Sequence, residues 1–224
     1  MLGTLFLGLT VWYLPGWMRS AEPRAEVMAS VSNAFPRASV AFKSWDGDRL
    51  VWPHAVESAD KEAWRFAFEI ATLPPDVRKN LILVGHSLGG RITARVLAHL
   101  AAKNIKIRQG VLLAAAIPST DADLGRMGGG SELPILAVRN PKDVTLSYIY
   151  ATVGGERARA FGAVGSAEPL PNVQHCIVPR NITEEVAIDA KWAQVQFFKN
   201  VANHHELFYF EYLRRVLAGE DEGL

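Results

Sequence analysis

The hexapeptide GHSLGG at residues 85–90 constrains the fold of this chain more than any other feature. It follows the continuously apolar run Leu81–Val84, and such runs are typical of strands buried on both faces of a parallel sheet. After it, apolar residues recur every three or four positions through residues 88–103, which predicts an amphipathic helix. The glycines allow a strand and a helix to approach closely around a sharp turn. This pattern places Ser87 at the tip of a strand–turn–helix unit.

Strands and helices alternate along the rest of the chain. The apolar, β-branched runs that we predict as strands are Thr10–Leu14, Ser39–Phe42, Leu81–Val84, Gly110–Leu113, Ile135–Arg139 and Val173–Val178. The predicted helices are Glu57–Thr72, Leu88–Lys103, Glu184–Ala202 and Leu207–Ala218. This alternation predicts an α/β fold with a doubly wound, mostly parallel sheet of about six strands flanked by helices. We expect residues 1–224 to form a single domain.

The composition excludes several other classes of protein. Hydrophobic residues make up 49% and charged residues 21% of the 224, which is ordinary for a globular chain. The formal net charge is +1, so nothing indicates a nucleic-acid partner. Cys176 is the single cysteine, which excludes an internal disulfide and a cysteine-rich zinc site.

The apolar run Leu2–Leu14 has two interpretations. No lysine or arginine precedes it, which disfavours a secretory signal, and it is too short to span a bilayer. It ends in Pro15-Gly16, as a strand does before a turn. We therefore predict a buried strand, with an export segment as the alternative. No transmembrane helix is expected, and the lack of a clear signal favours a cytoplasmic location.

Two polar or small-residue segments are predicted as long loops. Ser119–Ser131 is polar and rich in glycine, and Val153–Asn172 is rich in Gly, Ala and Pro. Long loops of this kind in a compact domain are often functional.

The hexapeptide resembles the nucleophile elbow of the α/β-hydrolase superfamily, in its esterase and lipase branch. The resemblance extends from about Val11 to Leu217, although only the elbow is highly specific. It implies that Ser87 is a nucleophile, and that a catalytic acid and then a catalytic histidine follow it along the chain.

The resemblance implies an acid just after a strand downstream of the elbow. Asp143 follows the predicted strand Ile135–Arg139, in the sequence NPKD, at the sheet edge where ligands bind in such folds. Asp143 is also placed to cap a helix over 144–150. Asp121 and Asp123 follow the preceding strand and are the alternatives.

The six histidines leave two candidates for the base. His54 precedes the elbow, His86 belongs to it, His99 lies in the following helix and His175 in a predicted strand; these four are set aside. The remaining pair, His204 and His205, precedes the last predicted helix, where the family often has Gly-His-x-x-aromatic. That alignment implies His204 as the base, with His205 as the alternative.

The resemblance also implies an oxyanion hole made of two backbone N–H groups. The first belongs to Leu88, the residue after the nucleophile. The second is expected from the turn after the first strand, where Pro15-Gly16-Trp17 resembles the family's His-Gly-aromatic turn. The donor there is Trp17, with Met18 as the alternative.

These roles predict a serine hydrolase that cleaves a carboxylic ester through an acyl-enzyme, without a metal or another cofactor. The substrate is expected to be a small-molecule ester, with an apolar acyl group indicated by the apolar residues Trp12, Trp17, Met18 and Met127. Thioester or amide hydrolysis and acyl transfer use the same triad, and a non-catalytic binding module is the alternative from another class. We expect the helix at 184–202 either to cover the pocket as a lid or to pack on the sheet.

Overall fold

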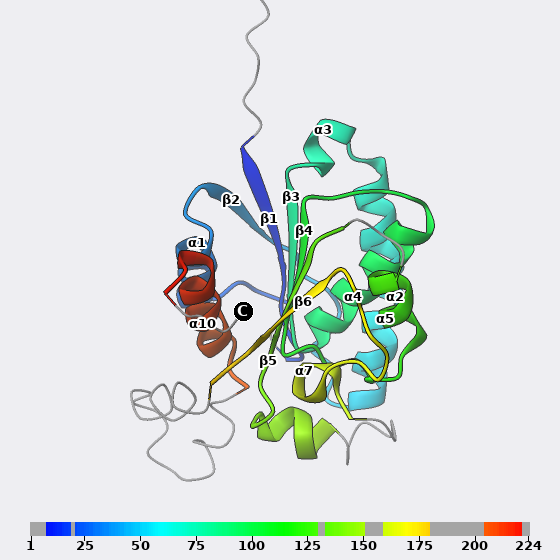
Figure 1. The fold of residues 1–224 in the computed structure, drawn as a ribbon, viewed down its shortest axis with the longest axis vertical. Helices are drawn as coiled ribbons and strands as arrows, with labels where there is room; N and C mark the ends of the chain where they lie inside the picture. The colour runs from blue at the N-terminus through cyan, green and yellow to red at the C-terminus, as the bar shows by residue number, and fades with distance from the viewer. Residues whose placement is uncertain (1–7, 19–20, 130–132, 151–158, 180–203, 221–224) are drawn as a thin grey trace, which may run out of the picture.

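A computed structural model describes residues 8–18, 21–129, 133–150, 159–179 and 204–220 (Figure 1). These residues form a six-stranded sheet with the order β2-β1-β3-β4-β5-β6, and every neighbouring pair is parallel. The strands are β1 (Leu9–Leu14), β2 (Ala38–Phe42), β3 (Leu81–His86), β4 (Gln109–Leu113), β5 (Ile135–Arg139) and β6 (Val173–Ile177). The ends of each strand agree with those of a predicted strand to within two residues, and the predicted fold class is confirmed.

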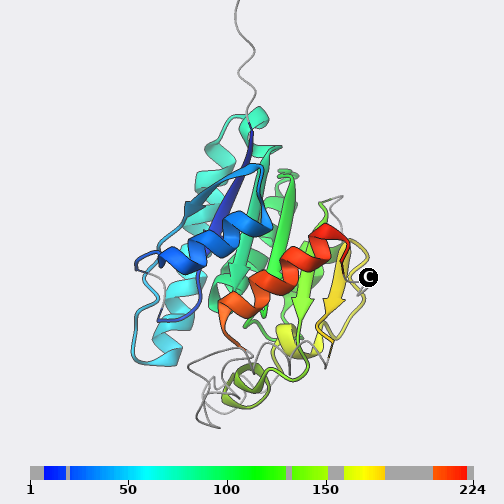
Figure 2. The same cartoon turned by 90° about the vertical axis from the view of Figure 1, so that its left-hand side faces the viewer.

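Helices cover both faces of the sheet, as a doubly wound fold requires (Figures 1 and 2). On one face lie α1 (Ala25–Ala34) and α10 (Glu206–Ala218), which pack against each other. On the other lie α2 (Trp52–Thr72), α4 (Leu88–Ala102) and α5 (Ala122–Gly129). Shorter helices are α3 (Pro75–Arg78), η1 (Thr145–Ile149) and α7 (Phe161–Val164).

The position of β3 explains where a site can form. All six residues of β3 are buried, because β1 and β4 flank it and helices cover both faces. Helix α1, after β1, lies on one face of the sheet, whereas α2, before β3, and α4, after β3, lie on the other, and the strand order reverses between β1 and β3. Ligands bind outside the carboxyl ends of the strands at such a switch point, and Ser87 follows the carboxyl end of β3.

The first predicted strand lies in the interior of the sheet. Residues Leu9–Leu14 pair with β2 on one side and with β3 on the other, and the last four are buried. Among the described residues, no helix combines the length and the apolar character needed to cross a bilayer.

Two predictions and one helix that was not predicted need comment. The prediction of a loop over Ser119–Ser131 is wrong, because α5 forms within it: Asp121 Oδ1 accepts the Asp123 N–H at 2.9 Å, and Leu124 and Met127 are buried. Helix α1 was not predicted. It buries only Val27, Val31 and Ala34 among its ten residues, so its apolar periodicity in the sequence is weak. The predicted helix over 184–202 lies outside the described residues.

Candidate active site

Ser87 occupies a strained turn between β3 and α4. Its backbone has φ 54° and ψ −118°, an unusual conformation for a residue with a side chain. Three hydrogen bonds hold this backbone. The Ser87 N–H donates to the Leu113 carbonyl at 3.0 Å, and the Ser87 carbonyl accepts the N–H groups of Ala116 at 2.9 Å and Arg91 at 3.1 Å. The neighbouring strand β4 and the loop after it therefore support the turn in which Ser87 is held.

The glycines of the hexapeptide are required by close backbone contacts. A Cβ atom on Gly85 would lie 2.2 Å from the Gly89 carbonyl oxygen, and one on Gly89 would lie 2.1 Å from the Leu14 carbonyl oxygen. A Cβ on Gly16 would meet Ser87 Cβ at 3.0 Å. The loop after β1 is thus packed against the turn and the first residues of α4.

The structure brings Ser87, His204 and Asp143 together from three separate parts of the chain. His204 Nε2 lies 2.9 Å from Ser87 Oγ, and His204 Nδ1 lies 2.7 Å from Asp143 Oδ2. Both distances are within hydrogen-bond reach, so one imidazole connects the hydroxyl to the carboxylate. The side chains of His204 and Asp143 are 14% and 0% exposed, which shields this connection from water.

Asp143 receives three hydrogen bonds in a fully buried position. Its Oδ1 accepts the Leu146 N–H at 3.0 Å, at the start of the η1 helix. Its Oδ2 is contacted by His204 and also accepts the Tyr209 O–H at 2.7 Å. Asp143 therefore both caps a helix and contacts the histidine.

The alternative acids and the alternative base have other partners. Asp121 and Asp123 accept hydrogen bonds from Arg95, at 3.1 and 2.6 Å. His205 is the N-cap of α10, and its Nδ1 accepts the Leu207 N–H at 3.3 Å. Among these candidates, the structure joins only Asp143 and His204 to Ser87.

The backbone N–H of Leu88 belongs to the first residue of α4, where no preceding turn supplies an acceptor. On the facing loop, the Met18 N–H donates to the Gly47 carbonyl at 3.3 Å. Within the described part of the chain, the Trp17 N–H has no such acceptor. Leu88 and Trp17 therefore have donors available for a ligand, whereas the alternative Met18 donates elsewhere.

His86 packs against the imidazole of His204. The two ring centroids are 5.0 Å apart, and the ring centroid of Tyr209 lies 5.6 Å from that of His86. Burial lowers the pKa of His86 well below its usual value, and the nearby His204 and His205 lower it further. His86 is therefore neutral at physiological pH, and its Nε2 has no hydrogen-bond partner.

An ion pair fixes the start of α10 beside His204. Arg24, at the start of α1, donates to one carboxylate oxygen of Glu206, and the Tyr13 O–H on β1 donates to the other. Glu206 is only 4% exposed, and Tyr13 is fully buried, which raises the pKa of Tyr13 above its usual range. These contacts join α10 to the sheet and to α1 two residues after His204.

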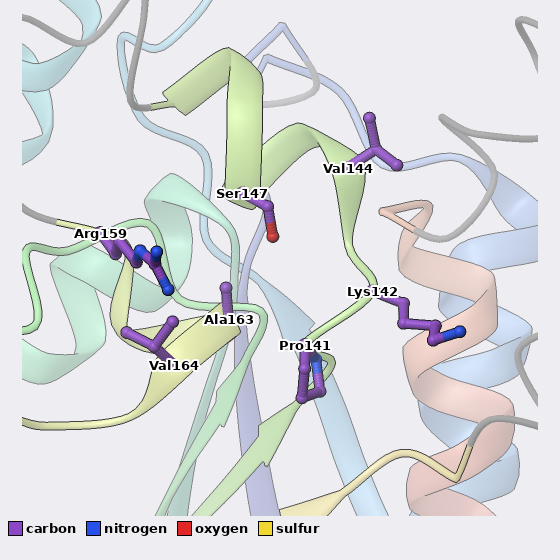
Figure 3. A pocket seen from close by; sticks show the side chains of 7 residues that line it. All are labelled: Pro141, Lys142, Val144, Ser147, Arg159, Ala163 and Val164. Atoms are coloured by element: carbon purple, nitrogen blue, oxygen red, sulfur yellow. The ribbon is translucent and has the colours of Figure 1, made fainter.

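A cavity of about 510 Å³ lies beside the loop that carries Asp143 (Figure 3). Its lining is mixed: the side chains of Ser147 and Arg159 point into it, and those of Ala163 and Pro141 bound it, whereas Lys142 points away. Val144 and Val164 complete the lining. Ser87 and His204 are not among the lining residues, so this cavity adjoins the acid loop rather than the hydroxyl.

Three residues of the site were missed at the sequence level. Tyr209, Glu206 and Arg24 contact the site or its supports, but each lies in a helix or at a helix start. The only available signal was the aromatic and acidic sequence directly after His204. Among the described residues, no group of three or more His, Cys, Asp or Glu side chains is arranged to hold a metal ion.

The parallel sheet, its flanking helices and the strained serine turn after β3 define the α/β-hydrolase fold. A candidate esterase from Staphylococcus aureus has this fold, with a TM-score of 0.51 at 9% identity, over 96% of this chain and 76% of that one.

Two other solved structures are also similar. They are Est1E from Butyrivibrio proteoclasticus with bound ferulic acid (TM-score 0.49, 12% identity, 94% of this chain and 88% of that one) and Arabidopsis thaliana SOBER1 (TM-score 0.46, 17% identity, 77% and 89%). No protein-family model and no curated protein matches the chain. At these identities the similarity concerns the fold.

Proposed function

We propose that this protein is a serine hydrolase that cleaves a carboxylic ester through a Ser87–His204–Asp143 triad. The observation that carries the proposal is the pair of contacts made by one imidazole, 2.9 Å to Ser87 Oγ and 2.7 Å to Asp143 Oδ2. A serine activated by a histidine that a carboxylate orients is the arrangement that acyl transfer requires. The esterases with a similar fold are consistent with this proposal.

The proposed reaction has two halves. Ser87 Oγ attacks the acyl carbonyl while His204 Nε2 accepts the hydroxyl proton, which it then gives to the leaving alcohol. Water attacks the resulting acyl-enzyme, with His204 acting again as base. Asp143 orients the imidazole and stabilises its protonated form.

The N–H groups of Leu88 and Trp17 are proposed to hold the oxyanion. The close packing of Gly16 on Ser87 brings the two donor loops together. Loss of one such donor costs about 3–4 kcal/mol of transition-state stabilisation in other serine hydrolases. The aromatic ring of Trp17 packs on that of Trp52, with centroids 5.2 Å apart, which favours an apolar acyl group.

Labelling with a fluorophosphonate probe tests the proposal. Wild-type protein should be labelled, Ser87→Ala should not, and His204→Ala should label far more slowly because its serine is not activated. Ser30→Ala is the matched control, because Ser30 lies on α1 and its hydroxyl donates to the Glu26 carbonyl one turn earlier in the same helix, rather than to a triad residue. A folded wild type that resists labelling would contradict the proposed activity.

Rates on matched oxygen esters and thioesters would then define the bond that is cleaved. Higher kcat/KM on the oxygen esters is the expected result. A preference for the thioesters would keep the triad and change the substrate class.

A further inference from the structure

Tyr209 is a buried polar residue that the proposed reaction does not yet use. It lies on α10, five positions after His204, and its side chain is fully buried. Its O–H donates to Asp143 Oδ2 at 2.7 Å, the same oxygen that His204 Nδ1 contacts at 2.7 Å. One short segment of chain thus brings two hydrogen-bond donors to a single carboxylate oxygen.

We propose that Tyr209 is a positioning residue, whose hydroxyl holds the Asp143 carboxylate in the orientation that His204 requires and withdraws part of its negative charge. The inference rests on the proposed serine hydrolase function.

The surroundings of Asp143 explain why a third donor matters. The carboxylate is 0% exposed, so water cannot complete its hydrogen bonds. The Leu146 N–H holds Oδ1, which leaves Oδ2 to His204 and Tyr209. Without the tyrosine hydroxyl, Oδ2 would keep only the imidazole as a partner among the described residues, and rotation of the carboxylate would be less restricted.

The ring of Tyr209 is itself held in place. Its centroid lies 5.2 Å from that of Phe208 and 5.6 Å from that of His86. Burial and the neighbouring Asp143 charge raise the pKa of Tyr209 well above its usual value. The hydroxyl therefore keeps its proton and remains a donor throughout the neutral range.

The charge environment predicts the sign of the effect. Among the described residues, the titratable and charged groups around His204 come from several elements. They are Asp143 on the loop after β5, His86 on β3, Tyr13 on β1, Arg24 before α1, and His205, Glu206 and Tyr209 from its own segment. His86 is neutral, and Arg24 pairs with Glu206. Asp143 is thus the charge in direct contact with the imidazole, and Tyr209 attenuates it.

Tyr209→Phe removes only the hydroxyl and tests the proposal. The Asp143 carboxylate should then stabilise the imidazolium more strongly, so the acidic limb of kcat/KM against pH should move up by about one pH unit. Plateau kcat should fall about tenfold, less than the roughly hundredfold expected for a 1 Å misplacement. A titration of the ¹³C-labelled His204 ring by NMR should show the same upward shift.

Tyr212→Phe is the matched control. Tyr212 is a buried tyrosine on the same helix, and its O–H donates to the Ile177 carbonyl at 3.3 Å instead. Its variant should leave both the acidic limb and the His204 titration where they are in the wild type.

Two results would overturn the proposal. One is an acidic limb and a His204 titration midpoint that do not move in Tyr209→Phe, which would reduce the tyrosine to a packing role. The other is an equal shift in Tyr212→Phe. The NMR titration needs no substrate, so it tests the role of Tyr209 independently of catalysis. A wild type that hydrolyses no ester and resists the fluorophosphonate would contradict the proposed function, but not the role of Tyr209.

Discussion

Removal of Arg24 should destabilise the protein, and a second substitution at Glu206 should restore part of the loss. The Glu206 side chain is 4% exposed, whereas that of Arg24 is 28% exposed. In Arg24→Met, the buried carboxylate keeps the Tyr13 hydroxyl as a donor and loses its cation. An uncompensated buried charge is what makes the loss of one partner of an ion pair so costly.

The magnitude follows from the two exposures. Breaking a buried ion pair costs about 3–5 kcal/mol, and we expect about 3 kcal/mol here because water reaches part of the Arg24 site. Adding Glu206→Gln removes the charge and leaves an amide oxygen to accept the Tyr13 O–H. The double variant should then lose only about 1 kcal/mol, so the second substitution restores about 2 kcal/mol.

Urea unfolding followed by circular dichroism and tryptophan fluorescence measures these differences, provided that the m-value stays constant. The matched control is Arg214→Met on the same helix. It breaks two exposed ion pairs, with Glu211 (34% and 42% exposure) and with Glu220 (34% and 51%). Exposed pairs contribute little, so its unfolding midpoint should hardly move. Because Glu206 lies two residues after His204, Arg24→Met should also lower kcat.

Additivity would refute this reasoning. If Arg24→Met/Glu206→Gln loses as much stability as the two single variants combined, then the two side chains are not coupled in the folded protein. A double variant less stable than Arg24→Met would have the same meaning.

Three further predictions concern the site. Gly85→Ala should prevent stable folding or cost several kcal/mol of unfolding free energy, since its Cβ would lie 2.2 Å from a backbone carbonyl oxygen. A Cβ on Gly125 has no described atom within 4 Å, so Gly125→Ala should stabilise α5, and thermal unfolding compares the two variants. Folding lowers the pKa of His86, so protons bind the unfolded state preferentially, and the free energy of unfolding should fall by up to about 1.4 kcal/mol per pH unit below about pH 6.5. Urea unfolding at several pH values measures this slope, and His86→Phe should flatten it. Asp143→Asn should lower kcat/KM for an ester by about 10⁴-fold, whereas Asp121→Asn should leave it within a few-fold, and the reverse would reassign the acid.

Local sequence was enough to predict the strands and the strained turn. The run Leu81–Val84 reads as a strand buried on both faces, and it lies at the centre of the sheet. Local pattern failed at α5, because glycines and aspartates over 119–131 favour a loop by propensity. Burial of Leu124 and Met127 and the Asp121 cap outweigh that preference, and both depend on neighbours outside the segment.

The chemistry of the site divides in the same way. GHSLGG by itself indicated Ser87 as the nucleophile candidate, because the glycines that the tight turn needs are part of the motif. A Cβ on Gly85 would meet the Gly89 carbonyl within the turn, and one on Gly89 would meet the loop after β1. The sequence reduced the acid to three aspartates and the base to two histidines. Only the tertiary structure shows which of these side chains lie within hydrogen-bond reach of one another. Parallel strands bring Asp143 to the edge of the sheet that carries Ser87, whereas Asp121 and Asp123 bind Arg95, and His205 caps the start of α10. The hydroxyl of Tyr209 and the pairing of Arg24 with Glu206 have no sequence signature, because each joins residues far apart in the chain, and such contacts exist only once the sheet has assembled.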